Sequence, residues 1–191
     1  MGLVIENLLR TTPLDADERD VCLRGIAQVA MADGTVDPRE RAYLQKFVDE
    51  FFPDADPTDE AWSRPLVDDD LKRLKSDPAR QSFLGYGYIT AYIDESFDDT
   101  EEKVLSAWAG QLVSPEVQAE ILTAVREFLY RRAVFAYAFR LGRLDDEFAV
   151  KASTRFSVPA ERVQELNAGV FNAIMTIRNP TQAQAEAQSG S

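Results

Sequence analysis

Apolar residues recur along this chain at the three- and four-residue spacing that places side chains on one face of a helix. Leu44, Phe47, Val48 and Phe51, for example, follow the i, i+3, i+4, i+7 rule. No stretch shows the sustained alternation of apolar and polar residues that is typical of a strand. The pattern predicts an all-α fold, with helices over residues 17–32, 38–52, 79–94, 105–112, 114–142, 145–156 and 159–177.

Capping residues support several of these boundaries. In Asp37-Pro38-Arg39-Glu40, an Asp stands at the expected N-cap, Pro at the first helical position and Glu at the third, which is the arrangement of a capping box. Asp77-Pro78 and Ser114-Pro115 open helices in the same way, and Gly142 is an expected C-terminal stop. The helices are therefore expected to be joined by short connections.

A shift of 61 residues superimposes two segments of the chain. Asp33 then meets Asp94, and the helix behind each loop matches as well. The duplication predicts a compact helical bundle built from two related antiparallel helical hairpins, plus further C-terminal helices. We expect an N-terminal segment over 1–14 and one all-α domain over 15–178, followed by a disordered tail over 179–191. Within that domain the hairpins span 22–52 and 83–113, and an acidic connector spans 53–77.

Six acids recur as matched triplets in the two hairpins and are the candidate metal ligands. Helix capping explains four of them, but the first acid of each triplet stands at the C-terminal end of a helix, where the helix dipole disfavours a negative charge. A bound cation would offset that cost, and so would a hydrogen-bond donor. Metal binding, helix capping and contact with a partner are all open for these residues, which are Asp33, Asp37, Glu40, Asp94, Asp98 and Glu101.

Composition restricts the chemistry further. The 191 residues include no His and one Cys, so any intrinsic metal site must use oxygen ligands, which suit Ca²⁺, Mg²⁺ or Mn²⁺. The same inventory excludes triads that need His, Cys-based zinc sites and an internal disulfide. Cys22 lies in an apolar run and is expected in the core. No constellation for catalysis emerges, and we expect a protein that is not an enzyme and needs no certain cofactor.

The net charge of −12 argues against nucleic acid as a partner, because phosphate binding needs a positive surface. The acidity is concentrated, since residues 1–110 carry 12 basic and 24 acidic side chains, whereas residues 111–191 carry 9 of each. No run approaches the length of a membrane span, and the first residues lack the pattern of a signal peptide. We expect a cytoplasmic protein, and peripheral association with a membrane stays open.

The string from Ala30 to Glu40, AMADGTVDPRE, followed by Leu44, resembles the signature of the TerB-like (tellurite-resistance B) family. That family is similar in turn to the N-terminal domain of a membrane-anchored DnaJ-like co-chaperone. The later GRLDDEFAV and FSVPAERVQEL resemble the closing helices of such domains. The second hairpin departs from the motif, with Glu95 where the family has Gly. The resemblance implies a non-enzymatic all-α domain, cytoplasmic or membrane-associated, linked to bacterial stress response, with acidic residues that bind metal.

Two functions follow as expectations. The first is a non-catalytic TerB-like module of stress response or of the cell envelope, whose acidic helix-loop-helix face contacts a protein partner or a divalent cation. The alternative is a structural adaptor that binds a partner through an apolar groove on the helix over 115–140, with no metal. The sequence defines neither the partner nor the oligomeric state.

Overall fold

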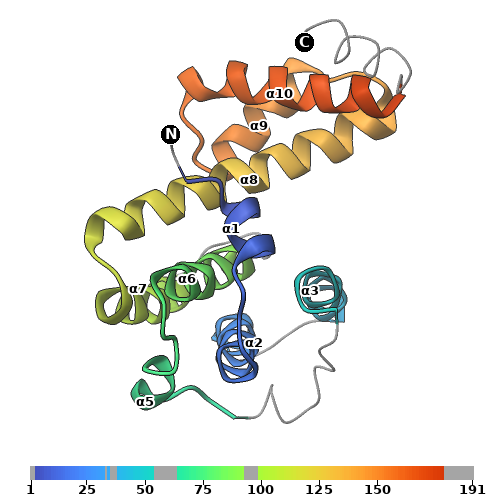
Figure 1. Ribbon diagram of the computed structural model, residues 1–191. Helices are drawn as coiled ribbons and strands as arrows, with labels where there is room; N and C mark the ends of the chain where they lie inside the picture. The colour runs from blue at the N-terminus through green and yellow to red at the C-terminus, as the bar shows by residue number, and fades with distance from the viewer. Residues whose placement is uncertain (1–2, 33, 35–37, 54–63, 93–98, 179–191) are drawn as a thin grey trace, which may run out of the picture. The chain divides into compact units, whose positions relative to one another are not determined.

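The computed structural model describes residues 3–32, 34, 38–53, 64–92 and 99–178, and of Pro38, Arg39, Glu40 and Tyr43 the backbone alone (Figure 1). Every regular element in these ranges is a helix, so the predicted all-α fold is confirmed. The helices are α1 (Ile5–Thr11), α2 (Ala16–Ala30), α3 (Pro38–Phe51), α5 (Asp68–Leu71), α6 (Asp77–Ala91), α7 (Asp99–Leu112), α8 (Pro115–Leu141), α9 (Asp146–Arg155) and α10 (Ala160–Arg178).

The chain forms two compact units, Met1–Val125 and Arg126–Ser191, whose boundary falls within α8. We call them the N-terminal unit and the C-terminal unit. The N-terminal unit carries 12 basic and 26 acidic residues, and the C-terminal unit carries 9 and 7. The acidity noted in the sequence is thus a property of one unit. The single domain expected over 15–178 stays a prediction, and the tail over 179–191 lies outside the described residues.

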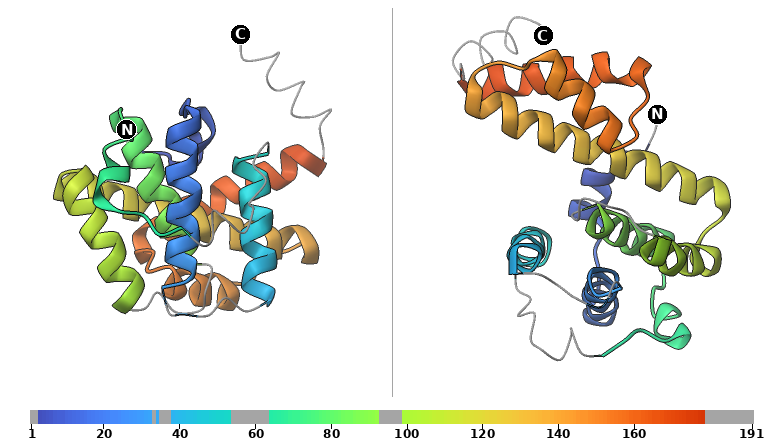
Figure 2. Two further views of the ribbon diagram at one scale, coloured as in Figure 1. Left: turned by 90° about the horizontal axis from the view of Figure 1, so that it is seen from below. Right: turned by 180° about the vertical axis from the view of Figure 1, so that it is seen from behind.

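In the N-terminal unit, α6 is the central helix and α1, α2 and α7 pack against it (Figure 2). Two glycines of α6 allow this close packing. A Cβ on Gly85 would lie 2.8 Å from Cδ1 of Ile5 in α1, and a Cβ on Gly87 would lie 2.6 Å from Cδ2 of Leu105 in α7. Larger side chains would push these helices apart. The close helix packing expected for Gly85-Tyr86-Gly87 is confirmed.

The helix boundaries repeat at the offset found in the sequence. The helices α2 and α6 begin at Ala16 and Asp77, and α3 and α7 begin at Pro38 and Asp99, each pair 61 residues apart. The ends of the helices repeat at the same offset. Burial repeats too, since the side chains of two matched pairs, Leu44 with Leu105 and Phe47 with Trp108, are buried.

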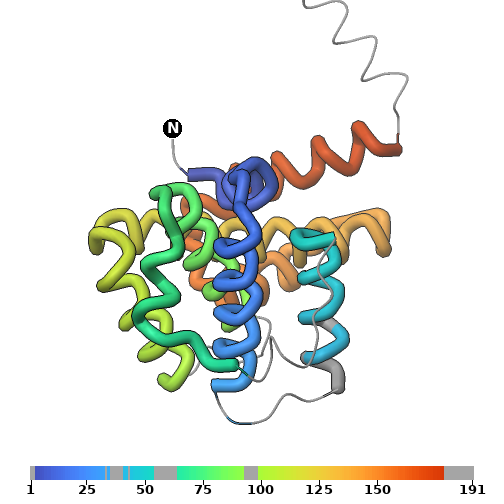
Figure 3. Tube along the Cα trace, turned by 60° about the horizontal axis from the view of Figure 1, so that its bottom comes forward, coloured from blue at the N-terminus to red at the C-terminus, as the bar shows by residue number. Residues whose placement is uncertain are grey.

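The first hairpin is completed by aromatic contacts that α3 makes across to α6. The rings of Phe47, Phe51 and Phe52 lie 6.1, 5.7 and 4.9 Å from the ring of Tyr86, measured between centroids. The hydroxyl of Tyr86 donates to the carbonyl oxygen of Leu9 at 3.0 Å, so this buried ring also ties α1 to α6. Figure 3 shows α2 lying between α3 and the segment that carries α5.

In the C-terminal unit, α10 runs parallel to the second half of α8. Three contacts fix this direction, because they join positions that advance together along both helices. Arg162 binds Glu127 at 2.8 Å, the hydroxyl of Tyr130 donates to Asn167 at 2.7 Å, and Arg178 donates to the carbonyl oxygen of Phe139 at 2.8 Å. The buried stripe of α10 consists of Leu166, Val170 and Ile174.

The short helix α9 connects α8 to α10 and contacts both. Gly142 has a φ of +74°, in the region that favours glycine, and ends α8 as the sequence predicted. The ring of Tyr137 in α8 stacks on Phe148 in α9, with 3.9 Å between centroids. The hydroxyl of Tyr137 donates to Asp145, whose carboxylate also caps α9 by accepting from the backbone of Phe148. The side chains of this turn therefore satisfy one another.

Candidate functional site

The acidic triplets predicted as metal ligands fall mostly outside the described residues. This holds for Asp33, Asp37, Asp94 and Asp98, and for the side chain of Glu40. Glu101 is described, and it occupies the third position of α7 with 6% of its surface exposed. Within the described ranges, no group of three or more His, Cys, Asp or Glu side chains could hold a metal ion. The metal hypothesis is therefore untested at these loops.

A second buried acid shows what the position of Glu101 requires. Glu18 is the third residue of α2, and only 5% of it is exposed. Its carboxylate accepts from the backbone N–H of Asp15 at 3.0 Å, while the carboxylate of Asp15 accepts from the backbone N–H of Glu18 at 2.9 Å. This capping box buries an acid without a metal. The burial of Glu101 at the same helical position does not by itself indicate a cation.

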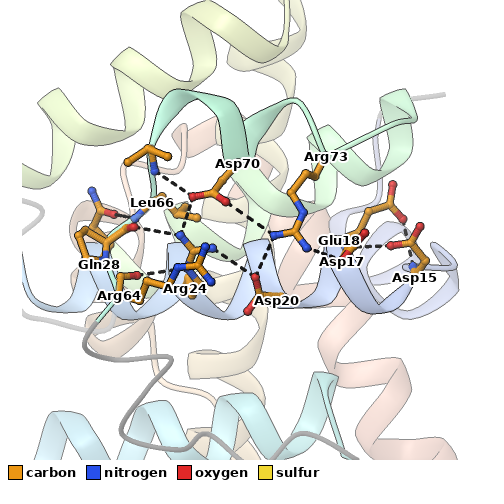
Figure 4. Close-up of polar contacts among 12 residues, drawn as sticks. Asp15, Asp17, Glu18, Asp20, Arg24, Gln28, Arg64, Leu66, Asp70 and Arg73 are labelled. Atoms are coloured by element: carbon orange, nitrogen blue, oxygen red, sulfur yellow. Dashed lines mark hydrogen bonds and ion pairs between the residues drawn. The ribbon is translucent and has the colours of Figure 1, made fainter.

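The most connected polar cluster lies elsewhere, on a face of α2 that sequence analysis missed (Figure 4). Asp17, Asp20, Arg24 and Gln28 follow helical spacing and so share one face of α2. They bind residues 64–75, a segment we call the strap, which includes α5. The spacing of these four polar residues, and the i, i+4 pair of Asp20 with Arg24, are the signals that could have revealed this face.

Arg24 is the centre of the cluster. Its side chain is 1% exposed, and its guanidinium donates to the carboxylate of Asp70 at 2.6 Å and to the carboxylate of Asp20 at 3.2 Å. It also donates to the carbonyl oxygens of Arg64 at 3.2 Å and Pro65 at 2.9 Å. A buried guanidinium is tolerated only when its donors are satisfied in this way. The hydrogen bond and charge of Arg24 lower the pKa of Asp70 to about 2.

Asp70 therefore differs from its neighbours in the acidic run Asp68-Asp69-Asp70. The sequence suggested a solvated face or a helix N-terminus for this run. Asp68 and Asp69 are exposed in the first turn of α5, as that interpretation requires. Asp70 is buried, because its carboxylate binds Arg24 and also accepts from the backbone N–H of Val67 at 3.1 Å. Sequence position alone did not separate the structural acid from its two solvated neighbours.

Further contacts fasten the strap along the length of α2. The side chain of Gln28 accepts from the backbone N–H of Leu66 at 2.8 Å, and Glu18 accepts from the backbone N–H of Lys75 at 3.1 Å. Arg73 pairs with Asp17, Asp20 and Asp70, and Lys75 pairs with Asp15 at 2.6 Å. Basic residues of the strap thus neutralise the acids of α2. This cluster holds the N-terminal unit together and leaves α2 no unpaired acidic face.

Exposed apolar side chains gather instead in the C-terminal unit. Of the large apolar side chains that are exposed in the described residues, Val4, Met31 and Val67 belong to the N-terminal unit. Six belong to the shorter C-terminal unit: Phe139, Leu141, Val150, Phe171, Met175 and Ile177. On α8 the large apolar side chains between Val117 and Tyr137 are buried or half-buried, and exposure begins at Phe139.

Four of these C-terminal side chains form a continuous surface. Phe171, Met175 and Arg178 stand at i, i+4 and i+7 on one flank of α10. The guanidinium of Arg178 lies over the ring of Phe139, 5.5 Å from its centroid, and so connects this flank to the end of α8. We call these four residues the α8–α10 patch. Apolar and aromatic side chains beside an Arg are typical of protein-binding surfaces.

Reactive groups are absent from the patch. The chain's Cys22 is fully buried in α2, as predicted, and burial raises the pKa of its thiol. The hydrogen bond from Tyr137 lowers the pKa of Asp145, in the turn where that carboxylate caps α9. The patch itself offers apolar area and one cation, which is chemistry for binding.

No helix in the described part of the chain has the length and apolar character needed to cross a membrane. Comparisons of the chain with protein-family models, with curated proteins and with solved structures find no match.

Proposed function

We propose that this chain is a non-catalytic protein-binding module in which the N-terminal unit is the scaffold and the C-terminal unit supplies the contact surface. The observation that carries the proposal is the α8–α10 patch, where Phe171 is 60% exposed and Met175 is 41% exposed. A contiguous exposed apolar surface of this kind is characteristic of interaction sites, whereas single exposed apolar residues are ordinary.

The polar cluster of the N-terminal unit supports the same division of roles. Arg24, Arg73 and Lys75 neutralise the acids of α2 within the chain. Those acids are therefore engaged in holding the strap. A binding surface placed in the C-terminal unit needs none of them.

The resemblance to the TerB-like family adds a biological setting to this proposal. The all-α fold agrees with it, and the two helical hairpins with matched boundaries are the organisation it implies. On this basis we propose a role in bacterial stress response or at the cell envelope.

A divalent cation at the acidic loops is a second candidate function. It is favoured by the ends of α2 and α6, since neither helix carries a basic residue in its last turn to balance Asp33 and Asp94. We expect calcium or manganese to raise the melting temperature of the wild type and to leave the D33A/D94A variant unchanged. An unchanged melting temperature of the wild type at millimolar metal would remove this candidate.

Affinity purification from the native host tests the main proposal. The F171S/M175S variant should lose partners that the wild type retains, because it removes most of the apolar area of the patch. V150S is the matched control, since Val150 is 63% exposed on α9 and lies outside the patch. Identical partner lists for the wild type and F171S/M175S would contradict the proposal, as would equal losses in V150S.

A further inference from the structure

The solvent-facing side of α10 is unusual for a surface helix, because it carries no charge over three turns. Residues 166–177 include no Asp, Glu, Lys or Arg, although Ala168, Phe171, Asn172 and Met175 are all exposed. Surface helices ordinarily place charged residues on their outer face. Charges return at the two ends of this stretch, with Glu161 and Glu165 before it and Arg178 after it.

A glycine in the middle of α10 has no packing reason within the chain. A Cβ on Gly169 would have no atom within 4 Å, whereas a Cβ on Gly85 or Gly87 would press on a neighbouring helix. Glycine weakens the interior of a helix relative to alanine. Together with Ala168 and Ala173, Gly169 leaves space for another helix to approach α10 closely.

We propose that a second copy of this chain docks on α10, with the two α10 helices antiparallel about Asn172. This inference rests on the proposed function and names the partner of the same surface. Met175 lies three residues after Asn172 and Ala168 four before it, so antiparallel pairing sets the large side chain of one copy against the small one of the other. The uncharged centre can face its own copy without repulsion.

The charged ends of α10 are complementary in this arrangement and in no parallel one. Arg178 lies six residues after Asn172, and Glu165 lies seven before it. Antiparallel pairing therefore brings Arg178 of each copy close to Glu165 of the other, twice per dimer. Parallel pairing would place Arg178 beside Arg178. A two-fold axis requires such self-complementarity of the paired surface.

Sedimentation of the full chain over a range of concentrations tests the pairing. The wild type should form a dimer whose dissociation constant is weakened about tenfold by R178E or by E165R alone, because each creates two repulsive contacts. The double variant E165R/R178E restores opposite charges across the axis and should recover most of the affinity. F171S/M175S should abolish the dimer. Circular dichroism of each variant checks that the helices remain folded.

Crosslinking with a short bis-maleimide tests the direction of the helices. Cys22 is buried, so a cysteine introduced by N172C is the reactive thiol of the folded chain, and it should couple two copies at the axis. Q164C is the control, because antiparallel pairing separates its two copies by roughly 24 Å along the helices. Efficient coupling of Q164C would indicate parallel helices and overturn the antiparallel arrangement.

A chain that stays monomeric at every concentration would overturn the inference, and so would a dimer that the charge variants leave unchanged. Neither result would refute the proposed function, which the partner lists of wild type and F171S/M175S test separately. If F171S/M175S loses a different protein while the chain is monomeric, the patch binds that protein and the self-association is wrong.

Discussion

The two units of this chain handle polar and apolar groups in opposite ways. The N-terminal unit buries charged groups at its centre, since Arg24 and Asp70 form a buried pair, and it exposes few large apolar side chains. In the C-terminal unit the charged pair of Arg162 with Glu127 is partly exposed, and Phe139, Phe171 and Met175 reach solvent. A unit that satisfies its own polar groups has the character of a scaffold. A unit that leaves apolar groups uncovered has the character of a contact surface.

The largest expected effect follows from removing the buried guanidinium. R24A should lower the free energy of unfolding of the N-terminal unit by about 3–5 kcal/mol, because it leaves Asp70 buried and unpaired. Both tryptophans of the chain belong to this unit, so urea unfolding followed by tryptophan fluorescence measures the change. R162A should cost about 1 kcal/mol or less in the C-terminal unit, since Arg162 is 38% exposed. Similar losses for the two variants would break the comparison.

Close packing around α6 gives the next largest effect. A Cβ on Gly25 of α2 would overlap the ring atom Cε2 of Phe83 in α6. An aromatic ring cannot yield as the end of an aliphatic side chain does, so G25A should destabilise the N-terminal unit by about 1–3 kcal/mol. Thermal unfolding followed by tryptophan fluorescence checks this. A variant as stable as the wild type would show that α2 and α6 are packed more loosely than the structure indicates.

The buried pair also predicts a dependence on pH. The pKa of Asp70 is lowered from 3.8 to about 2 in the folded protein, so the folded state favours the ionised carboxylate. Its contribution is present above pH 4 and is lost as the pH falls toward 2, with a magnitude of about 2 kcal/mol at most. Urea unfolding at several pH values should show this slope in the wild type. R24A should lack most of it, and an equal slope in both would contradict the assignment to the pair.

The smallest effect comes from the glycine that lacks a packing reason. G169A should raise the free energy of unfolding of the C-terminal unit by about 0.5–1 kcal/mol, because alanine favours a helix and nothing lies within 4 Å of the new Cβ. Far-UV circular dichroism of dilute protein during urea unfolding measures this gain. A loss of stability in the dilute chain would show that the site is covered within the chain, which would weaken the distinction between the two units.

Local sequence rules predicted most of the helices because caps and periodicity act over a few residues. The interval from Pro38 to the end of α3, the stop at Gly142 and the cap at Asp145 all follow from such rules. The offset of 61 residues also describes the helix boundaries. These features depend on neighbours in the sequence, so one chain is enough to find them.

The strap could not be predicted in the same way, because its anchors are distant in the sequence. Arg24 binds Asp70, which lies 46 residues later, and nothing local distinguishes Asp70 from Asp69. The α8–α10 patch was missed for a related reason. Periodicity assigned Phe171 to a helix, but it cannot show which flank of that helix the rest of the fold leaves uncovered. The acidic loops, which the sequence singled out, lie outside the described residues.

Methyl NMR of the full chain labelled at its methionines tests the central claim most directly. Met31 of the N-terminal unit and Met175 of the α8–α10 patch are similarly exposed, at 43% and 41%, so each is a matched control for the other. As protein concentration rises, or when a captured partner is added, the Met175 resonance should shift or broaden while that of Met31 stays in place. A response at Met31 with none at Met175 would contradict the assignment of the contact surface to the C-terminal unit.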